Sequence, residues 1–359
     1  MRRTLSMLVA ALALLAGMAP VSPASAGTPN HADESGRRTR FTQTNLVSDI
    51  PGRAPLQDPK LVNPWGLALG PTGPLWVANN GTGVATVYAG GPRGVTKQPL
   101  EVSIEGGAPT GEVFNDTREF VVKGAPATFI FSSESGAITA WNRNTGTTAV
   151  RVAGAPDAIY KGLALLHTRH GAFLLATDFH NGRIDVFDGR FRRLRLPSGR
   201  FHDPSIPRGF APFNVAVLGD SVFVTYAKQD ADAEDDVPGP GLGFVVKYRQ
   251  FGRVHHRFAS RGPLNAPWGL VIAPRSFGDF AGDVLVGNFG DGRINAFTPR
   301  GRFKGALRRP DGRPIEIDGL WALVRGTRTT GGTDAVWFSS GPDDETHGLV
   351  GLLRKARKH

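Results

Sequence analysis

Five carboxylates lie close together in the segment KQDADAEDD, residues 228–236, and their oxygens could coordinate a metal ion. Asp230, Asp232 and Glu234 alternate along the chain, and Asp235 and Asp236 follow directly. Calcium takes about six to eight oxygen ligands in flexible geometry, so alternating carboxylates suit it. The segment lacks the glycine that permits the sharp bend of an EF-hand loop. A solvated acidic loop is therefore the alternative to a calcium site.

A second group of reactive side chains lies in the segment DFHNGR, which contains Asp178 and His180. Histidine titrates near neutral pH, so His180 could act as a general base or a metal ligand, and an exposed turn histidine is the alternative. The other histidines lack HExxH spacing, and the chain has no GxSxG nucleophile elbow. Serine hydrolysis is therefore unsupported. The absence of cysteine excludes disulfides, thiol chemistry and lipoprotein attachment.

Short strands must position these groups, because one apolar segment recurs about every fifty residues along the chain. The copies are NPWGLAL at 63, APTGEVF at 108, IYKGLAL at 159, APFNVAV at 211, APWGLVI at 266 and IDGLWAL at 317. Further apolar strands follow each copy after Gly- or Asn-rich turns, which predicts antiparallel hairpins. The counts of 47 Gly and 27 Pro agree with many tight turns.

Three or four short antiparallel strands in about fifty residues are typical of a propeller blade. The sequence therefore predicts an all-β fold, a single six-bladed β-propeller over residues 41–353. Its blades start near residues 61, 108, 159, 211, 266 and 317. Residues 41–50 are predicted to form a strand that completes the last blade and closes the ring. Two separate β domains are the structural alternative.

Two positions in each repeat are expected to lie at the central channel, because the innermost strand of a blade lines it. The copies are aligned on Gly66, Gly111, Gly162, Asn214, Gly269 and Gly319. The position before holds Trp65, Thr110, Lys161, Phe213, Trp268 and Asp318. The end of the second strand holds Asn79, Ser133, Asp178, Lys228, Asn288 and Gly341. Trp65 and Trp268 could stack on a ligand or pack between blades.

Several strings resemble an uncharacterised family of exported bacterial β-propeller proteins over nearly the whole mature chain. They are NPWGLAL, DFHNGRIDVFDG, TYAKQDAD, NFGDGRINAF and DGLWAL. This resemblance implies no known activity. More distantly, the unit is similar to NHL-repeat and gluconolactonase- or regucalcin-like six-bladed propellers, and a fold alone does not determine function.

The lactonase-like resemblance implies a divalent cation held in the channel by Asp, Asn and Glu side chains. Asp178 and Asp318 match that pattern, with Asn79 and Asn288 as further candidates. Two lysines oppose it, because ammonium groups repel a dication and pair with carboxylates. They are Lys161 and Lys228. The alternatives are a channel cation, ion pairs that tie neighbouring blades together, and a metal-free anion site.

The first 26 residues have the pattern of a secretory signal peptide. Arg2 and Arg3 precede the apolar run LSMLVAALALLAGMA, and SPASA precedes Gly27, so cleavage is expected near Ala26. The run is shorter than the roughly 20 residues of a spanning helix, so we expect no transmembrane segment in the mature chain. The mature protein is predicted to be secreted or periplasmic, with a flexible lead-in at 27–40 and a basic tail at 354–359.

Composition narrows the class of partner. The formal net charge is +11, from 42 Lys and Arg against 31 Asp and Glu, and part of the excess lies in the leader and tail. No nucleic-acid module is recognisable, so no nucleic-acid partner is expected. Attachment to polyanions or membranes through the tail RKARKH is one further hypothesis.

The leading functional hypothesis is a monomeric, non-catalytic extracellular propeller that binds an unknown ligand or protein. Its loops at the channel mouth would carry the site. The candidate residues are Asp178, Asp318, Lys161, Lys228, Asn79, Asn288 and His180. The alternative is a metal-dependent lactonase-like hydrolase, in which a channel cation polarises a carbonyl and orients water.

Overall fold

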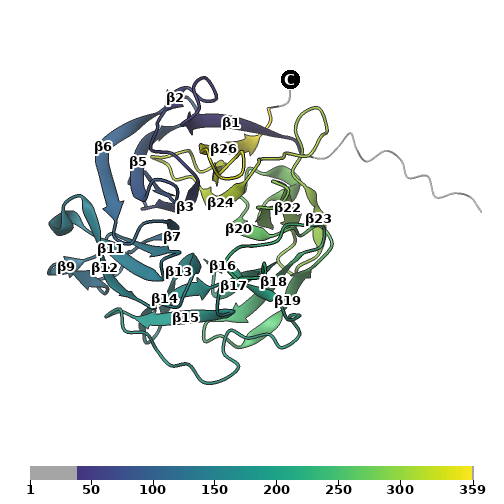
Figure 1. The fold of residues 1–359 in the computed structure, drawn as a ribbon. Helices are drawn as coiled ribbons and strands as arrows, with labels where there is room; N and C mark the ends of the chain where they lie inside the picture. Colours follow the sequence, from purple (N-terminus) through teal and green to yellow (C-terminus); the bar gives the residue numbers. More distant parts are fainter. Residues whose placement is uncertain (1–38, 358–359) are drawn as a thin grey trace, which may run out of the picture. The chain divides into compact units, whose positions relative to one another are not determined.

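The computed structural model describes residues 39–357, which form an all-β, propeller-like arrangement of sheets around a centre (Figure 1). Helical structure in this part of the chain is limited to the 3-10 turns η2 (Arg143–Thr145) and η3 (Gly278–Phe280). None of its helices has the length and apolar character needed to cross a membrane. The predicted signal peptide, nearly all of the lead-in and the end of the tail lie outside the described residues.

Antiparallel strands that are neighbours in sequence form each group. The first group is β3 (Pro64–Leu69), β4 (Leu75–Asn79), β5 (Val84–Gly91) and β6 (Gly94–Ile104). The second is β7 (Pro109–Phe114), β10 (Phe129–Ser133), β11 (Ala137–Trp141) and β12 (Thr148–Gly154). A small hairpin, β8 (Val121–Val122) and β9 (Ala125–Pro126), lies within it. Two parallel pairs between β6 and β12 join these groups into one sheet.

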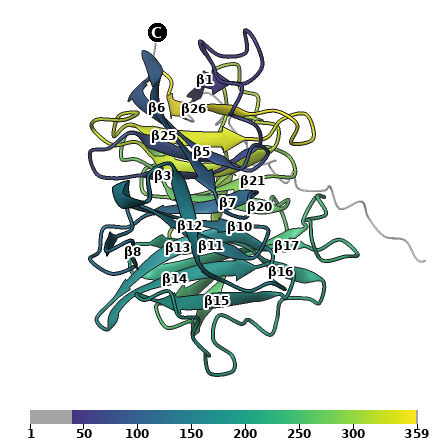
Figure 2. The same cartoon turned by 60° about the vertical axis from the view of Figure 1, so that its left-hand side comes forward.

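Three further groups of antiparallel strands follow, and Figure 2 shows the strands of the third group side by side. The third is β13 (Tyr160–Thr168), β14 (Gly171–Asp178) and β15 (Arg183–Asp188). The fourth is β16 (Phe210–Leu218), β17 (Ser221–Lys228), β18 (Gly243–Arg249) and β19 (Val254–Ser260). The fifth is β20 (Pro267–Ile272), β21 (Val284–Asn288), β22 (Ile294–Phe297) and β23 (Phe303–Ala306).

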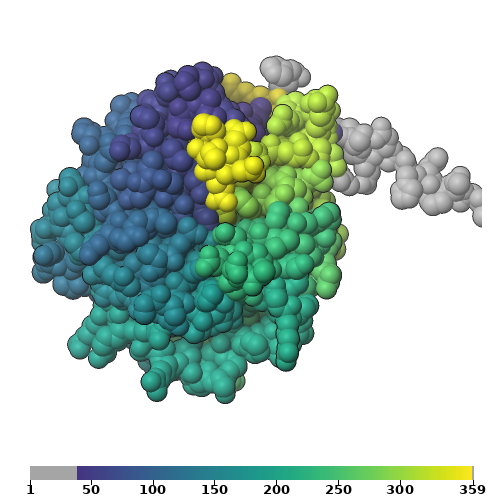
Figure 3. All heavy atoms as spheres, in the orientation of Figure 1, coloured from purple at the N-terminus to yellow at the C-terminus, as the bar shows by residue number. Residues whose placement is uncertain are grey.

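The last sheet combines both ends of the described chain. It contains β24 (Leu320–Arg325), β25 (Ala335–Ser340), β26 (Leu349–Lys355), β1 (Phe41–Ser48) and β2 (Leu56–Gln57). β1 pairs antiparallel with β26 from Phe41↔Lys355 to Ser48↔Leu349, with a bulge between Asn45 and Val47. This is the pairing expected of the N-terminal strand, and Figure 3 shows the C-terminal residues in yellow beside the purple N-terminal ones.

β26 also extends past residue 353, the predicted end of the β-structure. Arg354 and Lys355 belong to this strand, and the guanidinium of Arg354 donates to Asp334 Oδ2, with Nε at 3.1 Å. The predicted basic tail therefore begins inside the sheet.

The first strands of the groups form a closed circle around a channel. β3 contacts β7, and contacts continue through β13, β16, β20 and β24 back to β3. The close approach of neighbouring first strands requires the glycine that recurs in the sequence repeat. A Cβ on Gly66 would lie 2.5 Å from Thr110 O, and one on Gly111 would lie 2.3 Å from Leu163 N. Glycine at these positions thus allows neighbouring strands to pack backbone against backbone.

Strand register corrects the predicted equivalence in the sixth repeat. Leu320 pairs with Ser340 as Pro64 pairs with Asn79, so Trp321 corresponds to Trp65 and Asp318 does not. Gly319 serves a different purpose from the aligned glycines. It has φ +60°, and a Cβ there would lie 2.0 Å from Gly341 O, so it forms a turn before β24.

The fourth repeat needs a similar correction. Pro212 pairs with Tyr226, so Tyr226 corresponds to Asn79. The hairpin of β16 and β17 continues for two more residue pairs, which places Lys228 opposite Phe210, beyond the predicted position. The longer hairpin is the physical reason for the difference.

Candidate functional site

A polar cluster surrounds the ammonium group of Lys161, the second residue of β13. The side chain is buried, and Nζ donates to Glu134 Oε1 at 2.5 Å and to Asp235 Oδ1 at 2.8 Å. Nζ also lies 5.1 Å from the ring centroid of Trp65. Loops after β10 and β17 supply the two carboxylates. Lys161 therefore holds loops of neighbouring strand groups together at one end of the channel.

The cluster continues through two asparagines into the first and last strand groups. Asn80 Nδ2 donates to Glu134 Oε2 at 2.8 Å, and Asn63 Nδ2 donates to Glu345 Oε2 at 2.5 Å. Trp321 Nε1 donates to Asn63 Oδ1 at 2.9 Å. We call Asn63, Asn80, Glu134, Lys161, Asp235, Asp236 and Glu345 the mouth cluster.

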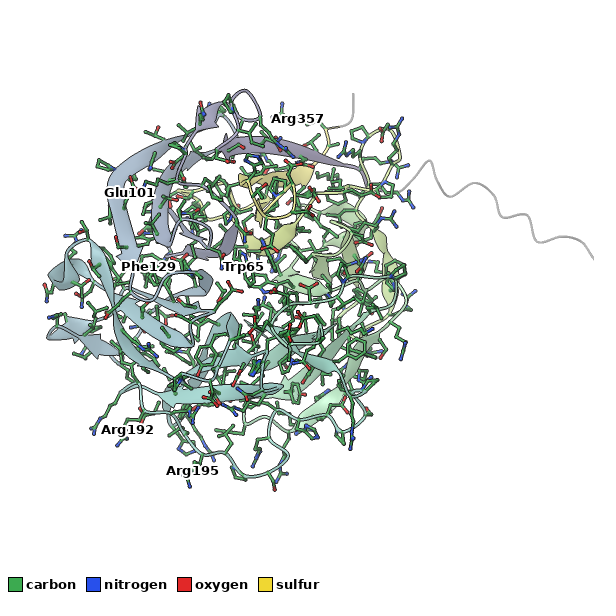
Figure 4. All side chains as sticks on the ribbon, in the orientation of Figure 1. Trp65, Glu101, Phe129, Arg192, Arg195 and Arg357 are labelled. Atoms are coloured by element: carbon green, nitrogen blue, oxygen red, sulfur yellow. The ribbon has the colours of Figure 1, made fainter. Side chains whose placement is uncertain are left out.

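An aromatic layer lies beneath the mouth cluster. The rings of Trp65 and Trp321 stack at 3.7 Å between centroids, and Phe289 stacks on Trp321 at 4.0 Å. Trp268 contacts both indoles edge-on. Figure 4 places Trp65 near the centre of the strand circle, whereas Glu101 and Arg192 lie at the periphery. All three tryptophans are buried, so their faces pack against one another.

Burial and neighbouring charges shift the pKa values of several groups in the mouth cluster. The pKa of Asp236 is raised to about 7, chiefly by burial, with Lys161 lowering it and Glu345 and Asp235 adding to the increase. Burial also raises the pKa of Glu345. Burial alone would lower the pKa of Lys161, but Glu134 and Asp235 outweigh this effect and raise it. The cluster thus contains one fixed cation and a carboxyl group that titrates near neutrality.

Backbone strain accompanies Glu345. Three successive non-glycine residues, Asp343, Asp344 and Glu345, have φ values of 56°, 52° and 63°. Left-handed backbone at such residues costs on the order of 1–3 kcal/mol each and is concentrated at functional sites. This turn brings Glu345 into hydrogen-bond distance of Asn63.

Asp178 is buried at the end of β14 and is occupied by local partners. It accepts from Asn181 N at 3.2 Å and Asn181 Nδ2 at 2.9 Å, and it pairs with Arg183 at 2.9 Å. Burial raises the pKa of Asp178 despite these partners. His180 is exposed, and its Nδ1 lies 3.3 Å from Ala233 O of the acidic loop. These contacts stabilise the turn and connect it to the loop.

The other candidates separate into surface and buried positions. Asp318 and Lys228 are exposed, and Asp318 Oδ2 accepts from Asp343 N at 2.9 Å. Asn79 and Asn288 are fully buried, and their amide nitrogens donate to backbone groups such as Val84 O and Pro263 O. Their Oδ1 atoms have no hydrogen-bond partner among the described residues.

These residues do not fit the channel cation implied by the lactonase-like resemblance. The in-register carboxylate, Asp178, is already neutralised by Arg183. Across residues 39–357, no group of three or more His, Asp or Glu side chains is arranged to hold a metal ion. In the predicted calcium loop, Asp230 Oδ1 instead accepts from Glu234 N at 2.9 Å, and the side chains of Asp232 and Glu234 are exposed.

The sequence predictions included Lys161 and, in the acidic loop, its partner Asp235, but not Glu134 or the Asn80 that binds Glu134. Asn80 and Glu134 directly follow the second-strand positions Asn79 and Ser133, so an inspection of the next residue in each repeat could have found them. Glu345 had no such signal, because the left-handed turn that positions it has no counterpart in the other repeats.

Comparison with known proteins gave relatives in sequence and in fold. No family model matches the chain. It is 32% identical over 326 residues to uncharacterised protein R648 of Acanthamoeba polyphaga mimivirus, covering 86% of this chain and 79% of the relative. It is 32% identical over 314 residues to uncharacterised protein L690 of the same virus, covering 83% and 81%.

Among solved structures, virginiamycin B lyase from Staphylococcus aureus is 10% identical, with a TM-score of 0.52, covering 89% of this chain and all 100% of the lyase. The GH93 α-L-arabinofuranosidase of Fusarium graminearum is 10% identical, with a TM-score of 0.55, covering 88% and 98%. At this level of identity, the likeness shows the β-propeller fold and carries no activity to this chain.

Proposed function

Since the chain belongs to the same family as the uncharacterised mimivirus proteins R648 and L690, we propose its function from the mouth cluster itself. The protein is an exported β-propeller that binds cationic groups of a partner at the channel mouth. One observation carries this proposal. Asp236 Oδ2 is buried without a hydrogen-bond partner among the described residues, beside Asp235, which accepts from Lys161, and Glu345, which accepts from Asn63.

The scaffold in this proposal has six blades. Each strand group that begins with β3, β7, β13, β16, β20 or β24 counts as one blade, which the closed circle of first strands supports. The pairing of β1 with β26 then completes the last blade. Such closure leaves little sheet edge exposed, which suits a protein without disulfides.

Export follows from the predicted signal peptide at residues 1–26, with the lead-in at 27–40 ahead of the propeller. A secreted or periplasmic location gives the mouth cluster access to extracellular partners. The bacterial family resemblance supports this location, and membership of that family is part of the proposal.

The chemistry of the mouth favours a cation. The ammonium group of Lys161 contacts the carboxylates of Glu134 and Asp235, and the carboxyl groups of Asp236 and Glu345 lie within its electrostatic reach. Guanidinium and ammonium groups form charge-assisted hydrogen bonds with carboxylates. The chain as a whole carries +11, so a basic partner is attracted to this acidic region specifically and repelled elsewhere. A lysine- or arginine-bearing segment of a protein fits these properties.

A labelled hexa-arginine peptide provides the test, with fluorescence anisotropy as the measurement. The chain of residues 27–359 is expected to bind the peptide saturably. The double variant Asp235→Asn, Glu345→Gln is expected to bind it about tenfold more weakly, because two partly exposed charge pairs are lost. Added salt should weaken binding to the wild type.

The control replaces a carboxylate outside the mouth cluster. Asp311 is half-exposed and lies 3.7 Å from Arg313, and Asp311→Asn should leave peptide affinity unchanged. Equal affinities for the wild type and the double variant would contradict the proposal. So would an equally large loss in Asp311→Asn, because binding would then follow overall charge.

A further inference from the structure

Glu112 is a buried carboxyl group in the wall of the central channel. It lies on β7, where it pairs across the strands with Phe131, and its exposed fraction is 6%. Neither Oε1 nor Oε2 has a hydrogen-bond partner among the described residues. Glu112 is not a member of the mouth cluster.

The equivalent residue of every other first strand is aliphatic. Strand register defines the equivalence. Each of these residues directly follows the position that corresponds to Gly66, which holds glycine, asparagine or alanine. They are Leu67, Leu163, Val215, Leu270 and Leu323. A single carboxyl group therefore replaces a hydrocarbon side chain in an otherwise apolar ring.

The ring lines a cavity of about 420 Å³. Residues of all the first strands contribute to its wall, among them Glu112 and all five aliphatic equivalents. Cavities of about 300–1,000 Å³ are typical of small-molecule sites. Each first strand is also the terminal strand of its group, so one backbone edge, with N–H and C=O groups, faces the channel.

Two more titratable groups line this cavity, and both are exposed. His167 Nε2 lies 3.0 Å from Asp116 Oδ1, and their side chains are 55% and 58% exposed. The cavity is therefore open to solvent beside this pair. Lys161 belongs to the mouth cluster, where its ammonium group contacts Glu134 and Asp235.

A carboxyl group without partners is costly in this environment. Burial raises the pKa of Glu112 well above its ordinary value, because the charged form loses its hydration. An apolar residue of similar volume would avoid that cost, as the five equivalent positions show. Perturbed carboxyl groups in clefts are candidates for binding or catalysis.

We propose that this cavity binds a small molecule with an apolar body and one basic nitrogen, whose cation pairs with the carboxylate of Glu112 when this side chain turns from its buried position toward the cavity. The cavity wall exposes hydrocarbon as well as polar groups, and its hydrocarbon groups contact the apolar body. The ammonium group forms a charge-assisted hydrogen bond with Glu112, and carbonyl groups of the strand edges accept from its remaining N–H groups. This site is independent of the mouth cluster and of a protein partner bound there.

Isothermal titration calorimetry with benzylamine tests the proposal, with benzyl alcohol as the neutral probe of similar shape. The wild type is expected to bind one benzylamine per chain and to bind benzyl alcohol more weakly. Glu112→Gln and Glu112→Leu should each lower benzylamine affinity by about tenfold or more. Glu101→Gln is the matched control, because Glu101 lies on the outer strand β6, and it should bind as the wild type does.

Because burial raises the pKa of Glu112 and a bound cation favours the ionised form, binding below that pKa should also release a proton. Benzylamine affinity is therefore expected to rise about tenfold per pH unit while Glu112 remains protonated. The rise should persist in Asp116→Asn and His167→Gln, which remove the other titratable groups of the cavity. It should disappear in Glu112→Gln.

Glu112→Leu separates loss of binding from loss of folding. This variant is expected to melt at the wild-type temperature or above, because it removes an unpaired buried carboxyl group. Benzylamine affinity equal to wild type in either Glu112 variant would overturn the proposal. An absence of saturable benzylamine binding to the folded wild type would overturn it too.

Discussion

A chain that begins at residue 49 is expected to lose cooperative unfolding, whereas a chain that begins at residue 39 should keep it. The difference is β1, which covers β26 along its whole length. Phe41, Leu46 and Val47 are buried, and the ring of Phe41 lies 4.9 Å from Phe277 and 5.9 Å from Phe280.

The loss of unfolding free energy expected on removal of β1 is comparable with the whole stability of a domain. Burial of three such side chains contributes roughly 1.5–3 kcal/mol each, and domains are stable by about 5–15 kcal/mol. Removal also opens the edge of β26, which invites pairing with other chains. Differential scanning calorimetry and light scattering would measure both effects. An unchanged melting temperature in the chain that begins at residue 49 would contradict closure by β1.

Trp321→Ala is expected to destabilise the protein by about 3–5 kcal/mol, the usual cost of removing a buried aromatic side chain. Trp321 is the centre of the aromatic layer, stacked on both Trp65 and Phe289. Its indole N–H also holds Asn63, which in turn holds Glu345. Loss of the indole should therefore weaken hexa-arginine binding as well as folding.

Guanidinium denaturation measures the loss of stability, and Phe303→Ala provides the control. Phe303 is 45% exposed on β23, so its removal should cost far less than removal of Trp321. Trp321→Phe keeps an aromatic ring but lacks the N–H donor. This variant should recover much of the stability while binding stays weak. Full recovery of hexa-arginine binding in Trp321→Phe would contradict the role of the indole N–H in holding Asn63.

Several features of the fold could be read from the sequence because they repeat. The aligned glycines mark positions where a Cβ would meet the next strand, as at Gly66 and Gly111. The strand at residues 41–50 was recognisable as an addition ahead of the first repeat. Lys161 was predicted to lie at the channel, and its buried ammonium group contacts Glu134 and Asp235.

The features that were not predicted from the sequence depend on strand register and on departures from the repeat. In the sixth repeat, Gly319 was aligned with Gly66, although it forms a left-handed turn against Gly341. Asp318 was therefore assigned a position that Trp321 occupies. Local sequence does not encode such a shift, because pairing across strands sets the register.

Glu112 was missed for a related reason. The predicted channel residues directly precede the aligned positions, whereas Glu112 directly follows Gly111. A comparison of the next position would have shown one glutamate among five aliphatic residues. Its isolation from partners, however, depends on the three-dimensional packing of β7 and becomes visible only in the structure.

The pH dependence of hexa-arginine affinity tests the central claim most directly. Because the pKa of Asp236 is about 7 and a bound cation favours its ionised form, affinity should rise several-fold from about pH 6 to about pH 8. The rise should vanish in Asp236→Asn and persist in His180→Gln, which removes the nearby exposed histidine. An affinity that is independent of pH in the wild type, or a rise that survives in Asp236→Asn, would contradict cation binding by the mouth cluster.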